Sequence, residues 1–279
     1  MARIPVVLAS SGGKDSVLAL AALRAEAQWD VRGMLVTLTD DDDAVVMHGV
    51  PRALIAQQAS SLGLALHAVT IPRSPSNHVY ESCMAAALAR LGSEGIRHVA
   101  FGDIFLADVR QYRERMLARG DCVGVYPIWG RDSRELAGAF RRDGYRAVAV
   151  CIDGHRLPYE FAGRDLDDSF FADLPDDVDA CGENGEFHSF VYDGPGFTYP
   201  LRFARERQPP AERFHYCTIS PATTDRCARC GAPFECGMQA GLAECWCAKV
   251  PPIAPVDADA GCYCPRCLAE VSRAASARA

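Results

Sequence analysis

The stretch IPVVLASSGGKDS, residues 4–16, runs from an apolar segment into two glycines, a lysine, an aspartate and a serine. Residues 4–9 are predicted to form a strand, and residues 17–27 have the apolar spacing of a helix. The turn between them then lies at the carboxyl edge of a sheet, where open α/β proteins bind their ligands. The turn at residues 10–16 is therefore the first candidate site.

The same alternation of apolar runs and helical segments continues as far as residue 152. Nearly continuous apolar runs are typical of strands that are buried on both faces, as in a parallel sheet covered by helices. We therefore predict an α/β fold with a doubly wound, Rossmann-like parallel sheet. The predicted strands are residues 4–9, 31–38, 64–70, 98–101, 122–126 and 145–152, and the predicted helices are residues 17–27, 51–62, 78–91, 106–117 and 133–142.

Three parts of the chain differ in composition. Residues 1–155 hold the predicted sheet, and residues 156–218 form a second lobe that is first charged and then rich in turn residues. Residues 225–270 form a cysteine-rich tail, which holds eight of the 13 cysteines. A polar stretch at residues 218–226 is predicted to be the linker into this tail.

The overall composition limits the classes of function. The formal net charge of −7 argues against a polyanion-binding surface over the whole protein, although it leaves room for a local basic groove. No apolar run approaches the roughly 20 residues that span a bilayer. The apolar start also runs into a glycine–lysine–aspartate turn rather than a signal cleavage site. We expect a cytoplasmic protein that acts on small molecules and has no membrane partner.

The residue types in the turn favour the binding of a triphosphate. Two glycines let the backbone come close to a ligand, so that N–H groups and the helix N-terminus face a phosphate, while Lys14 adds a positive charge. Asp15 would repel a polyphosphate unless Mg²⁺ offset its charge, so we predict ATP together with Mg²⁺. The spacing matches neither a Walker A motif nor the dinucleotide fingerprint. The residues predicted to bind ATP here are Ser10, Ser11, Gly12, Gly13, Lys14, Asp15 and Ser16.

A second motif, CGENGEFHS at residues 181–189, packs two carboxylates, an amide, an imidazole and two glycines into nine positions. Its glycines suit a tight backbone path. Glu183, Glu186 and His188 are groups that bind Mg²⁺, orient an amine nucleophile or accept its proton. The alternative is a polar surface turn, and this motif taken alone does not decide between the two.

Both motifs together resemble those of a known enzyme family. The SGGKDS turn resembles the PP-loop of ATP pyrophosphatases, which cleave ATP between the α and β phosphates. With the second motif, the chain resembles the diphthine–ammonia ligase family over roughly residues 3–200, and stretches at residues 47–51, 101–104 and 127–129 fit the same pattern. The resemblance implies a PP-loop (HUP-type) sheet and an enzyme that uses ATP and ammonia to turn a carboxylate into an amide, releasing AMP and pyrophosphate.

The resemblance also implies roles for individual residues. Gly102 and Asp103 join the ATP-binding set and, with residues 183–188, line the acceptor and amine side. The implied catalytic residues are Lys14, Asp15, Glu183, Glu186 and His188, with the general base open among the last three. Around Asn184 the chain departs from the pattern expected of eukaryotic members. The acceptor, a small-molecule or protein carboxylate, therefore stays open.

The tail has the short cysteine spacings of metal-binding modules. Eight thiols within about forty residues suffice for one or two four-thiolate zinc sites, with an iron–sulfur cluster as the alternative. The spacings resemble a small bacterial C-W-C family, and the pairing of the thiols stays open. We expect the tail to stabilise the fold or to bind a protein partner. The predicted metal ligands are Cys227, Cys230, Cys236, Cys245, Cys247, Cys262, Cys264 and Cys267.

Two alternatives to the ligase remain at this stage. One is a PP-loop enzyme that modifies tRNA, but the charged side chains from residue 219 onward sum to zero, which gives a phosphate backbone little attraction. We therefore expect no nucleic-acid partner. The other alternative is a non-catalytic ATP-binding sensor, which would not need the proton-transfer groups of residues 183–188.

Overall fold

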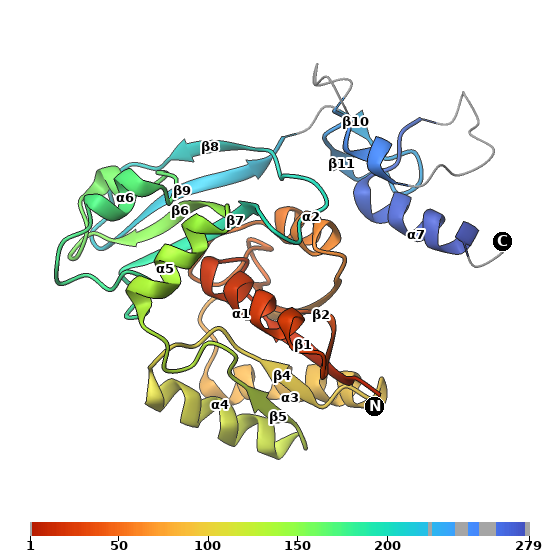
Figure 1. Cartoon of the computed structure of the whole chain (residues 1–279), viewed down its shortest axis with the longest axis horizontal. Coiled ribbons are helices and arrows are strands. Elements are labelled where there is room, and N and C mark those ends of the chain that lie inside the picture. The colour runs from red at the N-terminus through yellow and green to blue at the C-terminus, as the bar shows by residue number, and fades with distance from the viewer. Residues whose placement is uncertain (1, 223–224, 238–244, 251–260, 277–279) are drawn as a thin grey trace.

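The computed structural model describes residues 2–222, 225–237, 245–250 and 261–276. The chain has three parts: a parallel sheet with helices, an antiparallel sheet, and a small tail beside α2 (Figure 1). The α/β fold predicted from the sequence is confirmed.

Five strands form the parallel sheet, in the order β3-β2-β1-β4-β5. Because β1 lies in the middle, the turn that follows it opens at the centre of the carboxyl edge. The strands are β1 (Ile4–Ala9), β2 (Trp29–Thr39), β3 (Ala65–Ile71), β4 (His98–Ala100) and β5 (Val123–Val125).

Helices cover both faces of this sheet. Val6 and Leu8 of β1 pack in the same core as residues of α1 and α2, whereas Val7 between them packs with residues of α3 and α4. Successive side chains of a strand point to opposite faces, so the two cores lie on opposite sides and the sheet is doubly wound as predicted. The helices are α1 (Lys14–Ala25), α2 (Arg52–Ser61), α3 (Asn77–Ser93), α4 (Ala107–Arg119) and α5 (Ser133–Arg142).

The antiparallel sheet corrects one prediction. Residues 145–152 do not form a sixth parallel strand: β6 pairs antiparallel with β7 and β9, in the order β7-β6-β9-β8. The interpretation failed because β6 is buried along almost all its length, and an antiparallel strand covered on both faces has the same apolar run as a parallel one. The strands are β6 (Arg146–Asp153), β7 (Phe187–Asp193), β8 (Phe203–Arg207) and β9 (Phe214–Pro221).

Strand β9 also corrects the predicted linker at residues 218–226, because it continues to Pro221 and so includes the first four of those nine residues. Two short helices, η1 (Tyr159–Phe161) and α6 (Asp168–Ala172), cover the sheet. Phe170 of α6 lies at their centre, with ring centroids 5.2 Å from both Phe161 and Phe187.

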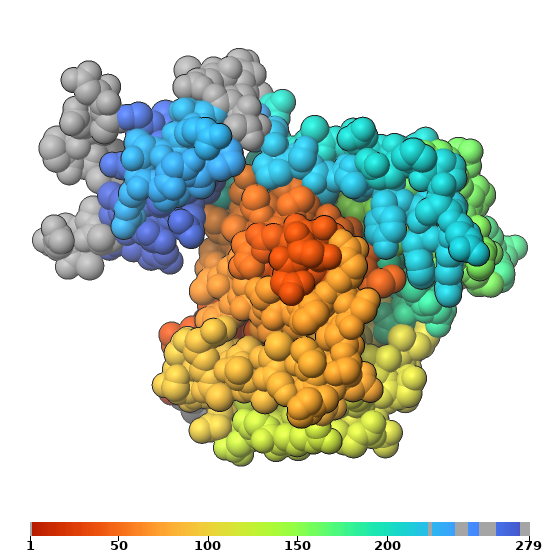
Figure 2. Space-filling view, turned by 180° about the vertical axis from the view of Figure 1, so that it is seen from behind, coloured from red at the N-terminus to blue at the C-terminus, as the bar shows by residue number. Residues whose placement is uncertain are grey.

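The tail packs against the body through α2, an aromatic pair and an ion pair between Arg202 and Glu235 at 2.9 Å. Helix α7 contacts α2, and the ring of Trp246 lies 5.3 Å from that of Tyr199. In the space-filling view the tail (blue) projects from one side of the body (Figure 2). Its elements are β10 (Asp225–Arg226), β11 (Pro233–Phe234), η2 (Trp246–Lys249) and α7 (Pro265–Ser276). Within the described ranges, each helix is too short or too polar to cross a membrane.

Replacing Phe170 tests the packing of the second lobe. Phe170→Ala should lower the free energy of unfolding by about 3–5 kcal/mol, because it empties a fully buried aromatic position. Urea denaturation measures the change. The control Val79→Ala, at a site 37% exposed on α3, should stay within about 0.5 kcal/mol of the wild type. Equal losses in both variants would contradict this packing.

Candidate functional site

The turn after β1 leaves the start of α1 open to a ligand. Gly13 is the N-cap residue of α1, and without a side chain it cannot itself cap the N–H groups of the first turn. Unpaired N–H groups at a helix start attract anions. Gly12 has φ of 81°, in the left-handed region that favours glycine. The predicted turn therefore combines a left-handed glycine with an N-cap residue that has no side chain.

Strand β7 of the second sheet lies along this turn. The N–H of Val191 donates to the carbonyl of Gly12 at 2.9 Å, and the N–H of Lys14 donates to the hydroxyl of Ser189 at 3.1 Å. The motif at residues 181–189 leads into this strand. The two predicted motifs, far apart in sequence, are thus adjacent in space.

Gly102 lets the loop after β4 approach α1. A Cβ atom on Gly102 would stand 2.7 Å from the carbonyl carbon of Asp15 and 3.0 Å from the nitrogen of Ser16. No side chain fits at such distances. Gly102 is therefore required for packing at the helix start, and it brings Asp103 beside the turn.

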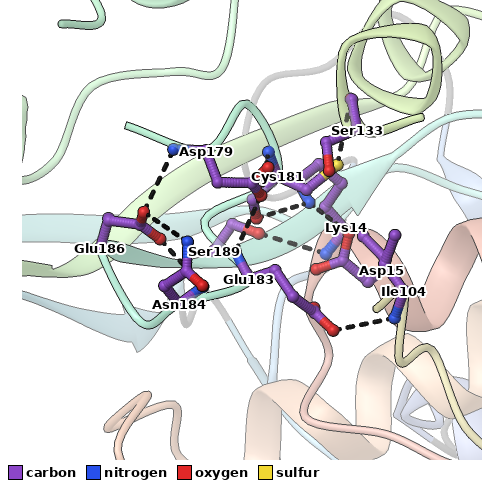
Figure 3. A network of polar contacts seen from close by, with 10 residues as sticks. All are labelled: Lys14, Asp15, Ile104, Ser133, Asp179, Cys181, Glu183, Asn184, Glu186 and Ser189. Carbon is purple, nitrogen blue, oxygen red and sulfur yellow. Dashed lines mark hydrogen bonds and ion pairs between the residues drawn. The ribbon is translucent and has the colours of Figure 1, made fainter. Parts of the chain in front are cut away.

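Lys14 is buried at the junction, with only 1% of its side chain exposed. Its ammonium group pairs with Asp15 and donates to the carbonyl of Cys181 at 3.0 Å (Figure 3). Burial alone would lower the pKa of Lys14, but Asp15 and Cys181 outweigh it and raise the pKa. The lysine therefore carries its charge and joins the turn to the second motif.

Glu186 organises the second motif from within. Its carboxylate, 2% exposed, accepts from the N–H of Asp179 at 3.1 Å and from the backbone and side-chain nitrogens of Asn184, each at 3.0 Å (Figure 3). Asp179 in turn accepts from the N–H groups of Cys181 and Glu183. These bonds occupy both oxygens of Glu186, so the carboxylate points toward the loop that carries it.

A cavity of about 360 Å³ lies between the turn, the loop after β4 and the second motif. Three residues of the predicted site do not line it: Gly12, Lys14 and Glu186. Those that do are Ser10, Ser11, Gly13, Asp15, Ser16, Gly102, Asp103, Glu183 and His188.

Glu183 is the carboxylate of the second motif that faces the cavity. It accepts from the N–H of Ile104 at 2.8 Å, so it bridges the motif and the loop after β4 (Figure 3). Burial raises the pKa of Glu183 to about 7, and the nearby Asp15 and Asp103 act in the same direction. Such a carboxylate exchanges protons near neutral pH.

Two histidines meet in the cavity. The rings of His48 and His188 are 4.6 Å apart. The pKa of His48 is lowered to about 3, mainly because the ring is buried and secondly because His188 lies beside it. Burial also lowers the pKa of His188, so both rings are neutral at pH 7.

Asp103 is paired across the cavity wall with Arg113 of α4. Oxygen–nitrogen distances of 2.8 and 3.2 Å join the two groups, and the guanidinium lies 4.5 Å from the ring centre of Phe101. Burial raises the pKa of Asp103, while Arg113 opposes the rise. Sequence motifs did not indicate Arg113, or Tyr80 and Met84 of α3, which also line the cavity. Only the helix packing brings them there.

The outer thiol group of the tail, Cys227, Cys230, Cys264 and Cys267, has the shape of a four-thiolate site. All four sulfurs lie within 4.8 Å of one another. Four sulfurs about 2.3 Å from a tetrahedral zinc stand about 3.8 Å apart, and the Cys230–Cys264 distance is 3.8 Å. Burial raises the pKa of Cys227, but N–H groups of Cys264, Cys230 and Arg229 lower it to about 6. The group is consistent with zinc.

The other four thiols form an inner group: Cys236, Cys245, Cys247 and Cys262. The sulfurs of Cys236 and Cys262 are 4.0 Å apart and lie within 4.8 Å of a carboxylate oxygen of Asp225. Cys247 contacts Cys245, and burial together with the other three thiols raises the pKa of Cys247 to about 12. The eight cysteines thus divide into two groups, with the inner one nested in sequence within the outer.

Comparison with known protein families also divides the chain into three successive parts. The N-terminal domain of diphthamide synthase matches residues 4–122, and the C-terminal domain of diphthamide synthase matches residues 132–224. The cysteine-rich CWC family matches residues 227–269. Among curated proteins, none matches the chain. The cavity thus lies where the two diphthamide synthase domains meet.

The raised pKa of Glu183 gives stability a pH dependence. Glu183→Gln, which keeps an acceptor for Ile104, should become more stable relative to the wild type as the pH rises from about 4.5 to about 7. Below this window the wild-type carboxyl group is neutral in both states. Through it, the folded state must hold a charge that burial disfavours, so the wild type loses stability.

The expected gain of this variant is on the order of 1–2 kcal/mol, because partial exposure screens the charge. Thermal unfolding of both proteins without nucleotide, followed across this pH range, measures the difference. Because the comparison is between two proteins, the titration of the histidines cancels. Curves that stay parallel would show that Glu183 is not perturbed.

Proposed function

We propose, on the premise that this chain belongs to the diphthamide synthase family, that it is an ATP-dependent ligase that joins ammonia to a carboxylate. One observation supports this above others. The phosphate-binding turn of one family domain and the proton-accepting groups of the other line one cavity. Nucleotide and nitrogen donor would therefore meet in it.

The proposed reaction has two steps. An oxygen of the acceptor carboxylate attacks the α-phosphorus of ATP, forming an acyl adenylate and releasing pyrophosphate. Ammonia then attacks the carbonyl carbon, loses a proton to the protein and displaces AMP, which leaves the amide. Adenylation is needed because a free carboxylate is a poor electrophile, whereas AMP is a good leaving group.

The side chains of the cavity suit these steps. Serine hydroxyls and free N–H groups at residues 10–16 would hold phosphates, with the buried charge of Lys14 behind them. Asp15 and Asp103 are oxygen ligands of the kind that Mg²⁺ prefers, and Mg²⁺ would offset phosphate charge. Glu183 and His188 face the cavity and would accept the proton from ammonia. Glu186 would hold the loop that carries them.

Two alternatives are disfavoured by specific residues. A tRNA-thiolating enzyme needs a reactive thiol, but burial raises the pKa of Cys181, which lines the cavity, to about 12. A non-catalytic sensor has no use for a carboxylate that titrates near pH 7 beside two neutral histidines. The acceptor, a small-molecule or protein carboxylate, is not assigned.

The tail is proposed to hold two structural zinc ions, one in each thiol group. The outer group supplies four thiolates, and the inner group supplies four more with Asp225 nearby. All 13 cysteines are free thiols, which suits the reducing cytoplasm. Because the tail packs on α2, we assign it a stabilising role for the body.

Products and a lysine variant test the proposed reaction. With ATP, Mg²⁺, ammonium and a pool of carboxylates, the protein should form AMP and pyrophosphate only when an acceptor is present. Lys14→Met should lower this turnover by at least about 100-fold, because the charge behind the phosphates is lost. Chromatography of nucleotides together with a pyrophosphate assay measures both.

The chain offers a matched control for this experiment. Lys249, its only other lysine, is exposed in the tail, and Lys249→Met should keep full turnover. Formation of ADP and phosphate would rule out adenylation. Turnover that requires tRNA would favour the modifying enzyme, and tight ATP binding without turnover would favour the sensor.

Metal analysis tests the division of the thiols. Protein purified with zinc should contain about two zinc ions per chain, and Cys264→Ser and Cys236→Ser should each lose about one. Cys83→Ser, outside the tail, should keep both. Elemental analysis by mass spectrometry gives the counts. Iron in place of zinc, or loss of both ions from either variant, would contradict two separate zinc sites.

A further inference from the structure

Gln58 is a buried side chain that contacts both sheets. It lies on α2 and is 0% exposed. Its amide nitrogen donates to the carbonyl of Gly12 at 3.0 Å and to the carbonyl of Val191 at 2.6 Å. One carbonyl belongs to the phosphate-binding turn and the other to β7. A single amide group therefore joins the two elements that form the cavity.

The orientation of this amide follows from its neighbours. Two carbonyl oxygens surround one of its atoms, and only the NH₂ group can donate to both. The other atom, Oε1, has no hydrogen-bond partner among the residues that the structure describes. A buried acceptor without a partner costs free energy. The amide group thus donates two hydrogen bonds while its oxygen accepts none from the residues that the structure describes.

These bonds fix the direction of one peptide plane in the turn. The carbonyl of Gly12 accepts from Gln58 and, at 2.9 Å, from the N–H of Val191. In a trans peptide the carbonyl and the following N–H point in opposite directions. The N–H of Gly13 therefore points away from Gln58. Gly13 lines the cavity, and Gln58 does not.

We propose that Gln58 is a positioning residue for nucleotide binding. By holding the carbonyl of Gly12 toward α2, it keeps the N–H of Gly13 turned toward the phosphates. Gln58 itself touches no ligand, and the inference rests on the proposed ATP site. A turn with two glycines can also sample the flipped direction of this peptide plane, which would present a carbonyl oxygen to a polyanion.

Ser61 provides a matched control on the same helix. It is also 0% exposed, its hydroxyl donates to the carbonyl of Tyr199 at 2.6 Å, and it accepts from the N–H of Tyr199 at 3.1 Å. Ser61 thus anchors α2 to the second lobe by two side-chain hydrogen bonds, and Gln58 anchors it there by one, to Val191. Only Gln58 also holds the turn. A comparison of the two separates positioning from simple stabilisation.

The test is the binding of Mg²⁺ and ATP to full-length Gln58→Met, Gln58→Glu and Ser61→Ala, measured by calorimetry without acceptor or ammonium. Both Gln58 variants should bind about tenfold more weakly or worse, which corresponds to about 1.4 kcal/mol. Gln58→Glu should be the weaker, because its carboxylate faces two carbonyls. At saturating ATP, any turnover should fall less than the affinity. Ser61→Ala should lower the melting temperature but keep wild-type affinity.

The outcomes separate this inference from the proposed ligase. If the variants bind as the wild type does, or if Ser61→Ala weakens binding as much, the positioning role is wrong. If the wild type binds ATP and the Gln58 variants do not, but no acceptor yields AMP, the ligase is wrong and the positioning role stands. If the wild type does not bind ATP, both are wrong. Melting temperatures confirm that each variant is folded.

Discussion

An ammonium group removed from water must be paired, and in this protein that requirement falls on Lys14. The lysine begins α1, beside the parallel sheet, yet one of its partners, the carbonyl of Cys181, belongs to the second lobe. A hydrogen bond from a charged group typically contributes about 1.5–3 kcal/mol, and this one crosses from one lobe to the other. The two lobes are therefore held together at the candidate site itself, and the bonds from β7 to the turn continue this junction.

Most of the parallel sheet was predictable because its signals are local. A strand buried on both faces needs an apolar run, and a helix start needs a residue such as Asp132, whose side chain accepts from the N–H of Glu135 at 2.9 Å. The pairing of β6 was predicted wrongly because it depends on signals that are not local. Its sequence shows that it is buried but not which strands lie beside it, because pairing with β7 and β9 depends on residues far along the chain.

The candidate site was predictable to the same extent. Two dense motifs indicated the candidate site, and both border the cavity. They did not indicate which carboxylate of the second motif faces outward, because Glu183 and Glu186 differ only in the bonds that the folded loop gives them. Arg113, His48 and Gln58 were not predicted for a related reason. Each is an ordinary residue of its own segment and comes to the candidate site only through packing.

The division of the site between two domains also has an evolutionary consequence. Gly12 faces Val191, and Lys14 faces both Ser189 and Cys181, so each partner lies about 170 or more positions away along the chain. A change on one side of this seam alters the surroundings of the other. Exchanging one domain for that of a distant relative would therefore preserve each fold while mismatching the contact between them.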